Sequence, residues 1–172
     1  MKICVQFVCL LWLLGLTQAE SFACVCGRIG SKPEQVRKQM QWEAERAEAI
    51  FVGEVIALDR LTAKFKVSAV WKGETQTEIT MTTGVKVTRD GHYTSSSCDY
   101  NFTPSGKYLV YARWVDGLLQ ASHCSGTTIL IPETTKEIET RVALLNEWQR
   151  KEKAKKDNLP ASRKRTRRIP FF

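Results

Sequence analysis

Apolar residues recur at helical spacing near the start of the mature chain. Ser31 is a candidate N-cap, and Glu34 follows three residues later in the arrangement of a capping box. The pattern predicts a helix from this point to about Glu48, with Met40 and Trp42 packed in the core. The apolar positions at helical spacing are Val36, Met40, Ala44 and Ala47.

Alternation with a period of two then predicts a series of short β-strands. Residues 65–72 place Phe, Val, Ala and Trp on alternate positions, and Asp116-Gly117 between two apolar runs is a strong hairpin signal. Five or six short strands separated by turns are typical of a small barrel or sandwich, so we expect a mainly β fold with flanking helices. The expected strands cover residues 49–58, 65–72, 79–81, 85–87, 107–115 and 118–123.

A second amphipathic helix is expected from near Pro132 to Gln149. Thr134 and Glu137 have the spacing of a capping box. Beyond it, residues 150–172 hold ten Lys or Arg against two acidic residues, a net charge of +8 that equals the net charge of the whole chain. This basic tail has little to bury, so we expect it to be disordered. The apolar face of the helix is Ile138, Val142, Leu145 and Trp148.

The first 19 residues have the pattern of a signal peptide. Lys2 precedes an apolar run from Val5 to Leu16. A membrane anchor is the alternative, but the run is shorter than the roughly 20 residues that span a bilayer. Small residues fit cleavage after Ala19 and also after Ala23, and the sequence does not choose between them. We therefore expect a secreted, extracellular protein with no membrane span.

Four cysteines remain once Cys4 and Cys9 leave with the signal peptide. In an oxidising compartment an even number predicts two disulfides, which allows three connectivities. Bonding Cys24 to Cys26 would close a small strained ring, so that pairing is disfavoured and the other two stay open. Zinc held by four cysteines is a competing interpretation, although the chain lacks the paired C-x2-C spacing of such sites. The four are Cys24, Cys26, Cys98 and Cys124.

Conventional catalytic motifs are missing from the sequence. His92 and His123 are the two histidines, and there is no glycine-rich phosphate loop, paired-His zinc motif or nucleophile elbow. We therefore expect no enzymatic activity and no cofactor.

Five segments together carry a resemblance to a known family. They are Cys24-Val25-Cys26 and residues 51–55, 65–73, 97–100 and 117–125. In this order and spacing, over about residues 24–130, the chain resembles the N-terminal domain of the tissue inhibitors of metalloproteinases, a netrin-like module. The resemblance implies one such domain over residues 24–149, built on a five-stranded OB-type β-barrel. It also implies the bridges Cys24–Cys98 and Cys26–Cys124.

The resemblance further implies an inhibitor of zinc metalloendopeptidases. In that family the α-amino nitrogen and carbonyl oxygen of the first cysteine, here Cys24, chelate the zinc of the target protease, which is the only metal involved. Val25 would enter the protease's specificity pocket, and Ser96 and Ser97 would flank the contact. Cleavage after Ala19 would leave four residues ahead of Cys24 and convert the chelating amine into an amide.

The alternative function is a netrin-like module that binds extracellular matrix or glycosaminoglycan without inhibiting a protease. Its support is the basic tail, because clustered Lys and Arg bind heparin-like polyanions. A solvated terminus or a proprotein-convertase site would explain the same tail. Secretion argues against a nucleic-acid partner. Asn101-Phe102-Thr103 matches a glycosylation acceptor.

Overall fold

The computed structural model describes residues 24, 26–27 and 32–158. The signal peptide, both cleavage sites, Val25, Ser31 and residues 159–172 lie outside this part of the chain. Two α-helices, one 3₁₀ turn and eight strands are described. In chain order they are α2 (Pro33–Arg46), β1 (Ala49–Leu58), β2 (Thr62–Lys72), β3 (Glu78–Thr82), β4 (Lys86–Val87), β5 (Tyr93–Thr94), β6 (Lys107–Val115), β7 (Leu118–Gln120), β8 (Thr128–Ile129), η1 (Pro132–Thr134) and α3 (Thr135–Asp157).

Five strands close into a barrel in the order β1-β2-β3-β7-β6, because β6 pairs again with β1. The β3–β7 pair is parallel, and every other pair around the barrel is antiparallel. The strand β8 adds to β6 outside the ring, and β4 and β5 form a separate two-stranded arm. This confirms the expected mainly β class with flanking helices and the OB-type barrel.

The barrel interior is filled by aromatic side chains that come from strands far apart in the sequence. Phe65 packs edge-on against Phe51 and Phe102, with ring centroids 5.6 and 5.0 Å apart. Phe51, Phe65 and Tyr108 are almost completely buried. Burying one such side chain contributes about 1.5–3 kcal/mol, so these rings dominate the stability of the barrel.

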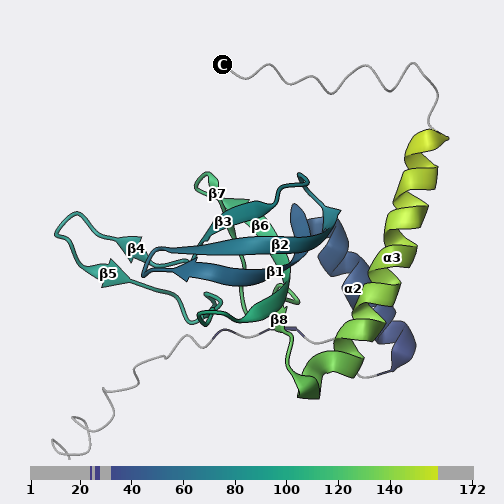
Figure 1. Cartoon of the computed structure of the whole chain (residues 1–172), viewed down its shortest axis with the longest axis horizontal. Coiled ribbons are helices and arrows are strands. Elements are labelled where there is room, and N and C mark those ends of the chain that lie inside the picture. Colours follow the sequence, from purple (N-terminus) through teal and green to yellow (C-terminus); the bar gives the residue numbers. More distant parts are fainter. Residues whose placement is uncertain (1–23, 25, 28–31, 159–172) are drawn as a thin grey trace, which may run out of the picture.

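The two helices pack together against the outside of the barrel. Figure 1 shows α2 and α3 side by side at one end, while the β4–β5 arm projects at the other end. A second core lies between them and the sheet, where Met40, Ile50, Tyr111 and Leu145 are buried. Neither helix among the described residues is long and apolar enough to cross a membrane.

The helix boundaries differ from those expected. The first helix ends at Arg46 rather than Glu48, because Ala47 is extended and β1 begins at Ala49. The second continues to Asp157, so residues 150–157 are helical and the prediction of a disordered tail from 150 onward is wrong over this stretch. Lys, Glu and Ala favour helix there, and the Lys151–Glu147 pair adds a contact one turn apart.

Two other expectations are corrected by local contacts. Thr134 occupies the N-cap position of the second helix as expected, but its side chain makes no capping hydrogen bond, because its hydroxyl donates to Ile129 O at the end of β8 at 2.6 Å. Trp42 is not a core residue, since half of its surface is exposed and Arg46 covers its ring. Met40, expected in the core, is buried.

Candidate functional site

Two disulfides hold the start of the described chain against two loops. Cys24 bonds Cys98 and Cys26 bonds Cys124, each with the Cα atoms 5.1 Å apart, and this is the pairing that the resemblance implies. The bridges lie side by side, because Cys24 Sγ is 3.5 Å from Cys124 Sγ. Cys24 and Cys26 are therefore fixed to the loops of residues 95–99 and 122–125, at what we call the bridge edge.

The loop that carries Cys98 is organised by a buried carboxylate. Asp99 Oδ2 accepts the Ser96 N–H at 2.6 Å, and its Oδ1 accepts from Gln120 Nε2 at 2.9 Å. The Cys98 N–H donates to Ser96 Oγ at 3.1 Å. These bonds link the loop to β7 and give Cys98 a fixed backbone position.

Gly84 lies directly against this carboxylate. It has a φ of +90°, and a Cβ built on it would come within 2.3 Å of Asp99 Cγ. Only glycine fits this combination of left-handed backbone and close approach. Neither residue is predicted from the sequence, because nothing in their spacing links Gly84 to Asp99.

The loop that carries Cys124 is closed by its own serines. Ser125 Oγ accepts the Ser122 N–H and hydrogen-bonds Ser122 O at 2.7 Å. Main-chain pairing joins this loop to the other, since the His123 N–H donates to Cys98 O at 2.9 Å and Asp99 forms a β-bridge with Ser122. Both anchoring loops thus have hydrogen bonds of their own in addition to the disulfides.

Most of the site residues expected from the sequence lie at or next to the bridge edge. Cys24 is half-buried at the bridge edge, and the exposed Ser96 and Ser97 lie on the loop to which it is bonded. Val25 lies outside the described residues. Asn101 is exposed beside the same loop, and Thr103 of its acceptor motif bonds the Tyr108 hydroxyl.

Sulfur ligation of a metal does not suit the bridge edge. The Sγ atoms of Cys24, Cys26 and Cys124 lie within 4.8 Å of one another. All three are in disulfides, however, and zinc binds the thiolate rather than a bridged sulfur. Any zinc chemistry here would use main-chain atoms.

A groove of about 440 Å³ adjoins the bridge edge. It runs between the β1–β2 turn and the loop of residues 95–102, and Arg60, Ser97 and Tyr100 are among its lining residues. Burial, with a smaller contribution from Tyr108, raises the pKa of the Tyr100 hydroxyl to about 12, so this side chain stays neutral at physiological pH. The groove presents neutral hydroxyls, the Arg60 guanidinium and the carboxylates of Asp59 and Asp99 next to the bridge edge.

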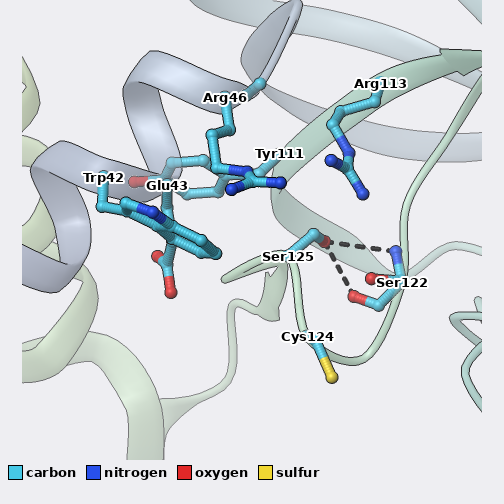
Figure 2. Close-up of a pocket in the computed structure, with 9 residues that line it drawn as sticks. Trp42, Glu43, Arg46, Tyr111, Arg113, Ser122, Cys124 and Ser125 are labelled. Carbon is cyan, nitrogen blue, oxygen red and sulfur yellow. Dashed lines mark hydrogen bonds between the residues drawn. The ribbon is translucent and has the colours of Figure 1, made fainter. Parts of the chain in front are cut away.

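A smaller cleft is lined in part by the Cys124 loop. It has a volume of about 130 Å³ and lies between α2 and β6, and we call it the α2–β6 cleft (Figure 2). Glu43 forms part of its wall, with a carboxylate that accepts from Gln39 at 2.9 Å and lies 3.7 Å from Arg141. Burial raises the pKa of Glu43, opposed by the Gln39 bond and the Arg141 charge. Helical periodicity predicts Trp42 in the core, so nothing in the sequence pattern indicates this cleft.

No protein-family model matches the chain, and a search of the curated proteins finds no significant match.

Proposed function

We propose that the mature protein is a secreted inhibitor of zinc metalloendopeptidases that acts through the backbone of Cys24. The observation that carries the proposal is the pair of adjacent bridges, which tie Cys24 and Cys26 to two hydrogen-bonded loops. The OB-type barrel and the ordered segments that resemble the inhibitor family support it.

The mechanism uses two main-chain atoms of one residue. A catalytic zinc keeps a coordination position for water, and a bidentate backbone ligand at that position stops hydrolysis. The free α-amino group has a pKa near 7.7–8.0 in model peptides, so zinc displaces its proton readily. Tethering by the bridges reduces the entropy lost when the terminus docks.

The test compares two forms of the purified protein that differ by one residue. A chain that starts at Cys24 should inhibit a zinc metalloproteinase stoichiometrically and leave serine proteases active. One alanine ahead of Cys24 should abolish inhibition, because an amide nitrogen is a poor metal ligand. N-terminal sequencing of the secreted protein establishes which form cells make.

A matched substitution separates chelation from general surface blocking. Val25→Gly leaves both chelating atoms in place and removes one side chain from the protease pocket, at a cost of about 1.5–3 kcal/mol of binding free energy. It should therefore weaken inhibition without abolishing it. Full inhibition by the alanine-extended chain would contradict the chelation mechanism.

The second candidate is a module that binds matrix glycosaminoglycan. The observation in its favour is the end of α3, where Lys151, Lys153, Lys155 and Lys156 are all exposed. The sequence adds five Lys or Arg after residue 158, so positive charge runs on from the helix into the tail. Clustered cations of this kind attract polyanions. This function requires no free amine at Cys24.

A further inference from the structure

Two arginines face the α2–β6 cleft without an acidic partner. Arg46 comes from the end of α2 and Arg113 from β6, and Figure 2 shows both guanidinium groups reaching into the space next to Ser125. Neither has an ion pair or hydrogen bond with the described part of the chain, and Arg46 only stacks on Trp42, 4.5 Å from the ring centroid. Two like charges beside one hollow favour an anion between them.

The acidic side chain in the wall does not supply that anion. Glu43 is directed toward Gln39 and Arg141, and Arg141 also donates to Gly126 O at 3.2 Å. Arg141 is shared with Glu137 at 3.1 Å, and burial favours the neutral form of Glu43 by raising its pKa. Among the described residues, Arg46 and Arg113 have no carboxylate within ion-pair distance, so the cleft keeps two positive charges that no acidic side chain pairs.

The size of the cleft and its side chains define the ligand chemistry. A guanidinium binds a carboxylate through two parallel hydrogen bonds, which makes arginine pairs effective carboxylate sites. A volume of about 130 Å³ accepts one side chain and falls below the several hundred Å³ of sites for larger small molecules. Trp42, half-exposed at the rim, supplies apolar surface, and tryptophan and arginine are the residue types most often critical in protein interfaces.

We propose that the α2–β6 cleft binds the carboxylate side chain of an acidic segment on a protein partner. Cys124 lines the cleft and is bonded to Cys26, so the cleft continues the bridge edge. A saccharide fits less well, because Ser125 Oγ is engaged within its own loop and offers little to sugar hydroxyls. The identity of the partner as a protease rests on the proposed function, whereas the carboxylate chemistry does not.

The test is an NMR titration of the purified protein at constant ionic strength. The probe is the acetylated and amidated peptide Gly-Gly-Glu-Gly-Gly, and the same peptide with Gln in place of Glu is the control ligand. The Glu peptide should shift the Trp42 indole N–H and the amides of residues 122–125 with saturation. The Gln peptide should not. Arg46→Gln and Arg113→Gln should each weaken binding about tenfold or more, whereas Arg89→Gln on the exposed arm should leave it unchanged.

The proposal would be overturned by a response without saturation, by an equal response to both peptides, or by equal weakening in Arg89→Gln. Saturation by a chondroitin sulfate tetrasaccharide but not by the Glu peptide would make the cleft a saccharide site instead. The alanine-extended chain should bind the Glu peptide normally, so failure of the chelation mechanism and failure of the carboxylate site give different results.

Discussion

Gly84 illustrates how a single position without a side chain supports the candidate site. Replacing it by alanine adds a backbone cost of about 1–2 kcal/mol at positive φ and a clash with the carboxylate that orders the Cys98 loop. We expect Gly84→Ala to lower the free energy of unfolding by about 2–4 kcal/mol. Urea denaturation of both proteins with the disulfides intact measures this loss of stability.

The matched control for this substitution is on the β4–β5 arm. Gly91 has a φ of +81°, and a Cβ there would meet nothing within 4 Å. Gly91→Ala should therefore cost only the backbone component, about 1–2 kcal/mol. Equal losses in the two variants would show that contact with Asp99 adds nothing.

The helical end of α3 determines where a deletion of the basic tail can begin. Deleting residues 150–172 would remove two turns of helix as well as the tail, so the deletion should begin at residue 159. If the protein binds polyanions, this deletion should lower the salt concentration that elutes it from heparin. Lys153→Gln with Lys156→Gln should lower it further, because each lost contact reduces the electrostatic attraction.

The control removes the same charge from the arm at the other end of the molecule. Lys86→Gln with Arg89→Gln should leave the elution salt nearly unchanged, since β4 and β5 lie far from α3 (Figure 1). Equal effects of the two double substitutions would indicate retention by net charge alone. Unchanged retention of the deleted and substituted chains would contradict the binding-module alternative.

Elements with a strong local pattern were predictable, and their ends were not. The alternation in residues 65–72 and the Asp116-Gly117 turn predict β2 and the β6–β7 hairpin, as observed. The arm strand β5 and the short strand β8 were missed, because two residues carry no periodicity. Trp42 fits the helical period but lies at the rim of a cleft, which only the packing of α2 on β6 determines.

At the scale of the whole molecule, the barrel closes through backbone pairing between strands. The disulfides instead attach Cys24 and Cys26, which precede the barrel in the chain, to two of its loops. The β1–β6 pairing runs over six residue pairs and needs no cysteine. The unfolded chain is nevertheless constrained by loops spanning 74 and 98 residues. In the chain-entropy model each such bridge contributes roughly 4–5 kcal/mol, with little difference between the two lengths.

Removing the Cys26–Cys124 bridge tests whether inhibition needs both tethers. Cys26→Ser with Cys124→Ser should leave a folded barrel whose free energy of unfolding falls by roughly 4 kcal/mol, measured by urea denaturation. Cys24 keeps its amine and its bond to Cys98, so chelation remains chemically available. Inhibition by a chain starting at Cys24 should weaken, because the terminus then has only one tether and loses more entropy on docking. Unchanged inhibition at the lower stability would show that the Cys24–Cys98 bridge alone positions the zinc-binding atoms.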